Sequence, residues 1–331
     1  MRDDPSLRGK PVAVAGSSRR AVVLTASYEA RPFGVRSAIP LYKALAACPQ
    51  LIVVAPDMAK YKAISREIFA VFAERGRRVE GLSMDEAFVD LENVPIDGAV
   101  EIAANIRARV LEKIGLTLSA GVSAAKMVSK IASDLCKPNG LRAIAPGKEA
   151  AFLAPLPVGR LWGVGPKTQT RLHTRGITTI GELAELDDSR LHALFGTWGY
   201  ELRELARGRD SRRVETDRET KSISTEETFE YDVTESYELL DLVRVQSEEL
   251  AGKLAAEKLS AQTVGIKIKR GDFSSIVRQT HLKEPTGDSS RIYAAAAHCL
   301  ERAELHGSPV RLLGTRVASL CESGPVQTDL F

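Results

Sequence analysis

Two neighbouring carboxylates in an otherwise apolar segment are the first side chains of this sequence that could do chemistry. The segment Ser83–Asp90 places Asp85 and Glu86 side by side. Carboxylates in an apolar strand are costly unless a cation joins them, and Mg²⁺ prefers such oxygen ligands. Adjacent side chains of a regular strand point to opposite faces, so a shared site requires a hairpin turn or a bulge here. The alternative is a solvated hairpin tip that binds nothing.

A second cluster combines a hydroxyl, a phenol and a guanidinium. Thr25, Tyr28 and Arg31 are spaced three residues apart at the end of an apolar strand expected at Val22–Ala26. Arginine offers a forked and permanently charged donor, and threonine and tyrosine add neutral hydrogen bonds. The set could therefore hold a polyphosphate. A turn that carries a surface arginine is the alternative.

A third cluster is basic. Lys126, Lys130 and Lys137 follow a strand expected at Leu116–Val122. The helix that begins after this strand must stop at the Pro-Asn-Gly run that starts at Pro138. An ordinary helix with a solvated basic face would give the same pattern.

Taken together, the three clusters are more specific than any one of them. Their order and spacing resemble the catalytic core of the Y-family DNA polymerases, in the polymerase IV branch, and the resemblance extends along nearly the whole chain. It implies that Asp85 is a metal ligand and that Glu86 lies beside the primer 3′-hydroxyl and can also approach the metal. It further implies that four side chains contact the triphosphate of the incoming nucleotide: Thr25, Tyr28, Arg31 and Lys137.

The activity that the resemblance implies is template-directed, low-fidelity translesion synthesis in DNA damage bypass and repair. Its chemistry would be nucleotidyl transfer assisted by two Mg²⁺ ions, with primer–template DNA and deoxynucleoside triphosphates as partners. Two alternatives stay open. One is a catalytically inactive protein that binds DNA and the sliding clamp. The other is a helix-hairpin-helix repair nuclease that uses Asp85 and Glu86 as metal ligands.

The first residues depart from the family pattern. Family members open with a palm strand of the kind His-x-Asp-x-Asp and two aromatic residues, one of which blocks ribonucleotides, whereas this chain begins just after the equivalent of that segment. Asp3 and Asp4 lie in a polar segment without strand character and are no substitutes. We therefore expect a missing metal-bridging carboxylate and weak polymerisation, through either a misassigned start codon or a genuinely shortened protein.

The size and charge of the chain agree with several domains. It has 331 residues, which is too many for one ordinary domain. Of these residues, 44% are hydrophobic and 27% are charged. The net charge is +3, with a basic excess in the first 147 residues and a slight acidic excess in the rest. Four widely spaced cysteines suggest neither disulfides nor a zinc site. No segment reads as a signal peptide or a membrane span, so we expect a cytoplasmic monomer without a membrane partner.

The resemblance places the functional side chains in an α+β multidomain fold shaped like a right hand. A polar, charge-dense segment without apolar period indicates a linker before the last domain, whose pattern is strand, helix, two strands, helix, strand. The expected parts are a fingers-like α/β segment at 1–57, a palm with the catalytic hairpin at 58–147, a helical thumb at 148–207, the linker at 208–220, a little finger at 221–318 and a flexible tail at 319–331.

The expected thumb contains a second type of DNA-binding pattern. Gly163, Gly165 and Lys167 resemble the turn of a helix-hairpin-helix, in which glycines let backbone N–H groups approach a phosphate and lysine adds charge. An ordinary turn between two helices is the alternative. In the family, this motif grips DNA without reading its sequence.

The expected little finger offers a basic strand face. Lys267 and Lys269 have the same strand parity, so both ammonium groups could face one phosphate strand while Ile266 and Ile268 face the core. A solvated sheet face is the alternative.

The last residues resemble the bacterial peptide that binds the DNA sliding clamp, Gln-x-x-Leu-Phe. In a flexible tail, Leu330 and Phe331 would be apolar anchors in a preformed groove, and Gln327 would make the polar contact. The sequence therefore predicts the sliding clamp as a partner.

Overall fold

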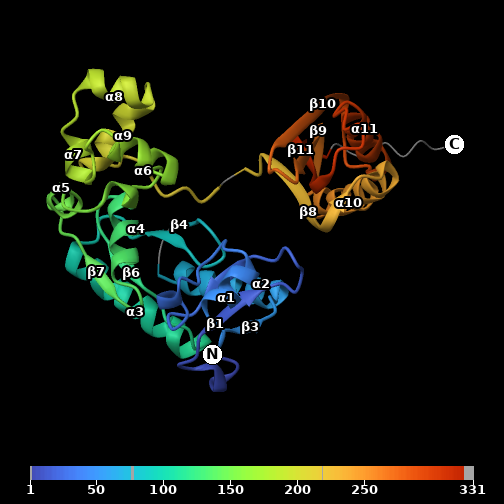
Figure 1. Ribbon diagram of the computed structural model, residues 1–331. Helices are drawn as coiled ribbons and strands as arrows, with labels where there is room; N and C mark the ends of the chain where they lie inside the picture. Colours follow the sequence, from blue (N-terminus) through green and yellow to red (C-terminus); the bar gives the residue numbers. More distant parts are fainter. Residues whose placement is uncertain (1, 76–77, 218, 324–331) are drawn as a thin grey trace. The chain divides into compact units, whose positions relative to one another are not determined.

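The computed structural model describes residues 2–75, 78–217 and 219–323 (Figure 1). The chain divides into two compact units. The first comprises Met1–Ser6 and Asp57–Asp217, and the second comprises Leu7–Pro56 and Arg218–Phe331. The architecture is mixed α and β, as the sequence predicts. No helix among the described residues is long and apolar enough to cross a membrane.

The first half of the first unit contains the hairpin that carries Asp85 and Glu86. Two strands form this antiparallel hairpin and two others form a separate parallel pair, so the strands of this region make two small sheets. Helices α2 and α3 pack on the hairpin through apolar side chains such as Phe72 and Ile106. The elements are α2 (Met58–Ala73), β4 (Arg78–Gly81), β5 (Ala87–Asp90), α3 (Ile96–Ile114), β6 (Ala120–Val122), α4 (Lys126–Leu135) and β7 (Leu141–Ala143).

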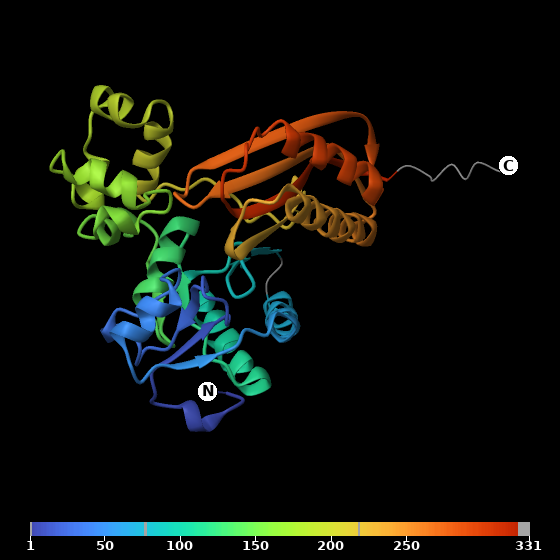
Figure 2. The same cartoon turned by 45° about the vertical axis from the view of Figure 1, so that its right-hand side comes forward.

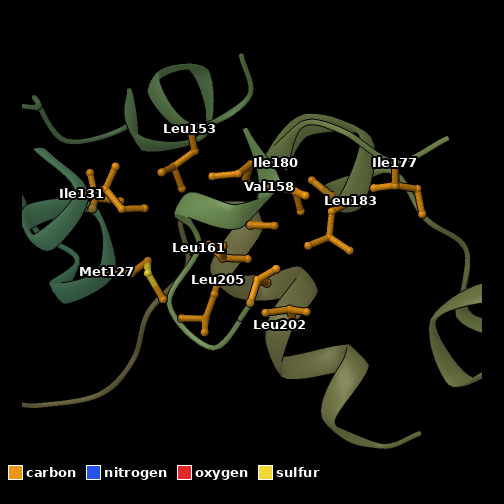
Figure 3. Close-up of a cluster of buried hydrophobic side chains, with 14 of the residues drawn as sticks. Met127, Ile131, Leu153, Val158, Leu161, Ile177, Ile180, Leu183, Leu202 and Leu205 are labelled. Carbon is orange, nitrogen blue, oxygen red and sulfur yellow. The ribbon is translucent and has the colours of Figure 1, made fainter. Parts of the chain in front are cut away.

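The second half of this unit is helical and shares its core with α4. Met127 and Ile131 of α4 lie in one buried cluster with Leu161, Leu202 and other side chains of the following helices (Figure 3). The expected boundary between palm and thumb is therefore no boundary in the packing. The elements are α5 (Glu149–Leu153), a 3-10 helix η3 (Val158–Arg160), α6 (Pro166–His173), α7 (Ile180–Ala184), α8 (Asp188–Phe195) and α9 (Trp198–Ala206).

The second unit begins with a small three-stranded sheet, which contains the strand expected at Val22–Ala26. After a 3-10 turn η1 (Pro5–Leu7), strand β1 (Val12–Ala15) pairs antiparallel with β2 (Val23–Ala26) and parallel with β3 (Ile52–Val54). A second 3-10 turn, η2 (Arg31–Phe33), and helix α1 (Leu41–Ala47) lie between β2 and β3. A small apolar core of mainly alanine and valine side chains holds these elements together.

The rest of the second unit is a four-stranded sheet with two helices on one face. Its elements follow one another in the predicted order of strand, helix, two strands, helix and strand. The strands lie in the order β10-β9-β11-β8, and Figure 2 shows both helices against the same side of the sheet. Ile266 and Ile268 are buried in this core, so the predicted alternation on their strand is confirmed. The elements are β8 (Ser222–Val233), α10 (Ser236–Glu257), β9 (Leu259–Arg270), β10 (Ser275–Thr286), α11 (Ser289–Glu301) and β11 (Val310–Glu322).

Two expected boundaries are wrong. Strand β11 continues to Glu322 because it pairs with β9 as far as Leu259, so residues 319–322 are not part of a tail. The expected linker at 208–220 also begins too early, because the first half of this segment is part of the first unit. Polar contacts hold this half on the first unit, for example the bond of 2.9 Å from the Met127 N–H to the Asp210 carboxylate. An apolar period is not needed where buried hydrogen bonds fix a segment.

Candidate active site and DNA-binding surfaces

The hairpin between β4 and β5 places the two carboxylates at its turn. The N–H groups of Leu82 and Ser83 donate to the Glu86 carbonyl oxygen at 2.8 and 3.3 Å, which closes the turn. The Ser83 hydroxyl donates to Asp85 Oδ1 at 2.6 Å. Asp85 and Glu86 therefore lie where regular strand alternation is interrupted, which is the geometry that a shared site requires.

Two lysines from α4 and the residues after it lie near the Glu86 carboxylate. Lys130 Nζ is 2.6 Å from Glu86 Oε1, and Lys137 Nζ is 3.9 Å from the same oxygen. Lys137 Nζ is also 2.6 Å from Asp134 Oδ1. The site thus holds acids that suit a cation beside ammonium groups that suit phosphates. Because the Glu86 side chain is 36% exposed, solvent screens its ion pair.

The donor set suits a magnesium site that substrate phosphates complete. Within the described ranges, no group of three or more histidine, cysteine, aspartate or glutamate side chains could hold a metal ion. Mg²⁺ is commonly bound by one or two carboxylates together with substrate phosphates and water. Asp85 and Glu86 at one turn supply carboxylates of this kind.

The three predicted phosphate ligands come together at the end of β2 in the second unit. Thr25 is an exposed strand residue, Tyr28 follows it in the turn that leads to η2, and Arg31 is the first residue of η2. The Arg31 guanidinium carbon lies 4.0 Å from the centre of the Tyr28 ring, and Arg31 Nε donates to the Ala26 carbonyl oxygen at 3.4 Å. The ring and this bond orient the guanidinium while its remaining N–H groups can serve a ligand.

The predicted helix-hairpin-helix turn immediately precedes α6. Gly163 has φ +100°, and a Cβ there would lie 2.9 Å from the Trp198 ring, so this position requires glycine on two grounds. Gly165 has an ordinary φ of −75° and is the N-cap of α6. Open space lies beside Gly165, and Lys167 in the first turn is exposed. Backbone N–H groups at such a helix start can approach a phosphate.

The sheet face opposite α10 and α11 contains a groove of about 350 Å³. Lys267 lines it, and its Nζ lies 2.8 Å from Glu226 Oε2. The sequence analysis missed Glu226 and Arg316, which line the same groove. Both come from strands that are distant in sequence, and β11 pairs with both β8 and β9. Only the period-two alternation of each strand could have signalled these residues, and it does not reveal which strands are neighbours.

The predicted clamp-binding residues Gln327, Leu330 and Phe331 lie outside the described residues.

Family models match this chain in three consecutive segments. The impB/mucB/samB family matches residues 1–134, the HHH motif of the IMS family matches 146–177, and the impB/mucB/samB C-terminal domain matches 220–330. The second match contains the turn at Gly163, and the third contains the sheet that carries Lys267. The order of the three segments is the one that the sequence analysis predicts.

Curated relatives are similar along the whole chain. DNA polymerase IV of Desulfatibacillum aliphaticivorans is 41% identical over 100% of this chain and 84% of its own length. DNA polymerase IV of Alkalilimnicola ehrlichii is 42% identical over 99% of this chain and 93% of its own length. The predicted lack of an opening palm strand is not confirmed by these matches, which cover the whole of this chain, and it stays a prediction.

Solved structures show the same fold. A chimera of the Y-family DNA polymerases Dbh and Dpo4 superimposes with a TM-score of 0.89 at 26% identity, over 96% of this chain and 94% of that one. An insertion ternary complex of Dbh DNA polymerase gives a TM-score of 0.67 at 25% identity, with the same coverage. Together with relatives above 40% identity, these matches show that the chain belongs to the impB/mucB/samB family of Y-family DNA polymerases, in its polymerase IV branch.

Proposed function

We propose that this chain is a template-directed DNA polymerase that adds deoxynucleotides to a primer 3′ end and copies damaged templates at low fidelity. The observation that carries this proposal is the hairpin turn that carries Asp85 and Glu86, with the Glu86 carboxylate beside Lys130 and Lys137. Carboxylates for a cation and ammonium groups for phosphates in one place suit phosphoryl transfer, which depends on positioning and electrostatics. The names of the relatives support the same activity.

In this proposal, the residues of the hairpin and of α4 hold the reacting groups. Asp85 and Glu86 would bind Mg²⁺, which supplies charge neutralisation on the triphosphate and acidifies the primer hydroxyl. Lys130 fixes the Glu86 carboxylate, and Lys137 would bind a phosphate oxygen. Four side chains would thus share the active site, and Thr25, Tyr28 and Arg31 would bind the rest of the triphosphate.

DNA would be held by two surfaces that contact phosphates and read no sequence. One is the turn at Gly163 and Gly165 with Lys167, and the other is the sheet face that carries Lys267 and Lys269. Both consist of backbone N–H groups or lysines, which fix the position of a duplex without distinguishing bases.

The test of the active site replaces each carboxylate without changing its size. Asp85→Asn and Glu86→Gln should each lower primer extension about a hundredfold or more, as the loss of an electrostatic contact in a transition state does. The affinity for primer–template DNA should stay within about threefold, because phosphate contacts elsewhere dominate it. Primer extension on a gel and fluorescence anisotropy measure the two quantities.

Glu101→Gln is the matched control, because Glu101 is an exposed acid of α3 in the same unit. It should leave both quantities unchanged. Full extension by the Asp85→Asn protein would disprove the proposed site. Shortened primers would indicate a nuclease instead, and DNA binding by the unmodified chain without extension would indicate the inactive DNA-binding alternative.

We also propose that the end of the chain binds the sliding clamp. Leu330→Ala with Phe331→Ala should weaken clamp binding by a few kcal/mol, in the range of anchor truncations at interfaces. Primer extension without clamp should stay the same, because the tail would only raise the local concentration at the primer end. Calorimetry against purified clamp decides, and Thr328→Ala with Asp329→Ala is the control. Equal affinity of the Leu330 and Phe331 variant and the unmodified chain would refute this partner.

A further inference from the structure

A buried ion pair of the hairpin and α4 holds the backbone of the segment that follows the last thumb helix. Glu80 of β4 is only 3% exposed and pairs with Lys126, the first residue of α4. Lys126 Nζ also donates to the Arg213 carbonyl oxygen at 2.9 Å, and the Glu215 N–H donates to Glu80 Oε2 at 2.9 Å. Each partner of the ion pair therefore binds one backbone group of the same segment.

The same segment caps helix α4. The N-cap residue of α4, Ala125, makes no side-chain cap hydrogen bond, as its methyl group dictates. Asp210 supplies the missing acceptor, because its carboxylate receives the Met127 N–H at 2.9 Å. A carboxylate at this end of a helix satisfies a backbone donor and complements the helix dipole.

Asp210 is itself firmly held. Its side chain is 1% exposed, and Arg212 Nε and Nη2 donate to its two oxygens at 2.7 and 2.8 Å. Burial would raise the pKa of Asp210, but the hydrogen bonds from Arg212 and from the Met127 N–H outweigh burial and lower it. The carboxylate is therefore charged at neutral pH and can cap the helix. The Arg212 guanidinium lies 5.3 Å from the centre of the Trp162 ring, which fixes it from the other side.

We propose that Glu80, Lys126 and Asp210 form a linker anchor that holds residues 210–215 on the first unit. Glu80 and Asp210 are then positioning residues: they set the point from which the chain is free to lead to the next domain. We call the seven steps of chain from Glu215 to Ser222, where β8 begins, the tether. At the full extension of a polypeptide, these seven steps reach about 25 Å, roughly half of what a linker at 208–220 would allow.

The anchor can be tested by two substitutions in the segment itself, so that the palm fold is not at risk. Asp210→Ala removes the cap of α4 and should speed amide hydrogen exchange about tenfold in the peptide that contains Met127, the usual size of a lost cap. Glu215→Pro removes the N–H that binds Glu80 and should speed exchange in the segment while leaving the Met127 peptide protected. Hydrogen exchange read by mass spectrometry separates the two effects.

Matched controls come from the next residues of the chain. Asp217→Ala makes the same charge change as Asp210→Ala, and Thr216→Pro adds the same ring one residue later. Neither Thr216 nor Asp217 hydrogen-bonds to Glu80, Lys126 or Met127 in the part of the chain that the structure describes. The anchor is refuted if Asp210→Ala leaves exchange at Met127 unchanged, or if the controls raise exchange as much as the test variants.

The effect on DNA binding rests on the proposed function. If both units grip one DNA, Asp210→Ala with Glu215→Pro lengthens the tether from about seven residues to about nine while the bond from Lys126 to the Arg213 carbonyl oxygen holds, and to about thirteen where that bond is lost. Primer–template binding should then weaken about 1.5- to 2.5-fold, since effective concentration falls with the −3/2 power of length. Fluorescence anisotropy measures this change. Faster exchange with unchanged DNA affinity would refute the shared grip on DNA and leave the anchor established. Unchanged exchange would refute the anchor at any DNA affinity.

Discussion

At the scale of single residues, the candidate active site is a turn that carries Asp85 and Glu86, with Lys130 beside the Glu86 carboxylate. The need for a turn at Asp85 and Glu86 follows from strand alternation alone, and the structure contains that turn. The partner of Glu86 is different. Lys130 belongs to a helix that begins forty residues later, so no local pattern pairs the two side chains. The cluster of lysines was visible in the sequence, but its contact with the hairpin required the fold.

Arg31 offers a residue-scale test of nucleotide binding. Arg31→Ala should raise the KM for deoxynucleotide about tenfold or more, because charged hydrogen bonds contribute roughly 1.5–3 kcal/mol each. The kcat should change less than KM if the guanidinium binds the triphosphate equally in ground and transition state. Steady-state single-nucleotide insertion gives both constants. Arg36→Ala is the control, since Arg36 is an exposed arginine five residues away, and equal effects of the two variants would contradict the assignment.

At the scale of elements, the sequence predicts the type and order of helices and strands better than their first and last residues or the elements that they pack against. The six elements of the last domain appear in the predicted order because their periods of 2 and 3.6 are local properties. Strand β9 begins at Leu259, directly after Lys258 ends α10 in a left-handed conformation, and the order of elements alone does not give this limit. The packing of α4 with the thumb was not predicted, because the apolar face of one helix does not identify what covers it.

Helix α7 provides an element-scale test that depends on pH. Glu182 accepts bonds from the N–H groups of Thr178 and Thr179 at 2.6 and 2.9 Å, and those bonds, that of Thr178 first, lower the pKa of Glu182 to about 2. A lowered pKa means that the bonds stabilise the fold above the unfolded value of 4.5 and are lost as pH falls toward 2. Stability should therefore decrease below about pH 4.5.

The measurement is urea unfolding at pH 5 and at pH 3. The unmodified protein should lose more stability over this interval than Glu182→Gln, which cannot titrate at this position. Glu185→Gln changes the exposed acid at the C-cap of the same helix and should behave like the unmodified protein. Equal losses of stability in the unmodified protein and in Glu182→Gln would show that the bonds from Thr178 and Thr179 to Glu182 carry no pH dependence.

At the scale of the whole molecule, polar contacts decide where the linker before the last domain begins, and composition placed this point wrongly. The segment after Gly208 is rich in charge and lacks an apolar period, which is typical of linkers. Asp210 and Glu215 nevertheless bind the palm through partly buried hydrogen bonds. Such contacts join residues more than eighty positions apart, and a sequence pattern contains no sign of them. The family resemblance gave the correct order of parts but not the place where the free chain begins.

The basic sheet face provides a test of DNA binding by a whole domain. Lys267→Ala with Lys269→Ala should weaken DNA binding for unrelated sequences alike and lower the slope of log affinity against log salt by up to about 2, one for each phosphate contact. Because Glu226 already neutralises Lys267, the slope should fall by less than this maximum. Anisotropy titrations at several salt concentrations give the slope.

Two comparisons sharpen this test. Glu226→Gln should strengthen DNA binding, since it releases Lys267, whereas Glu227→Gln changes the same charge at the next position of β8, whose side chain points to the opposite face. A loss that is confined to particular DNA sequences would indicate contacts to base edges and would contradict phosphate binding.

The common core of α4 and the thumb has a consequence for how the chain is made. Met127 and Ile131 leave the ribosome roughly seventy residues before Leu202 and Leu205, which belong to the same buried cluster. At a synthesis rate of about 5–20 residues per second, Leu202 and Leu205 follow the apolar side of α4 about 4 to 15 seconds later. During that interval, the apolar face of α4 is exposed in the nascent chain. Apolar surface exposed in this way is prone to aggregation and is the kind of surface that chaperones cover.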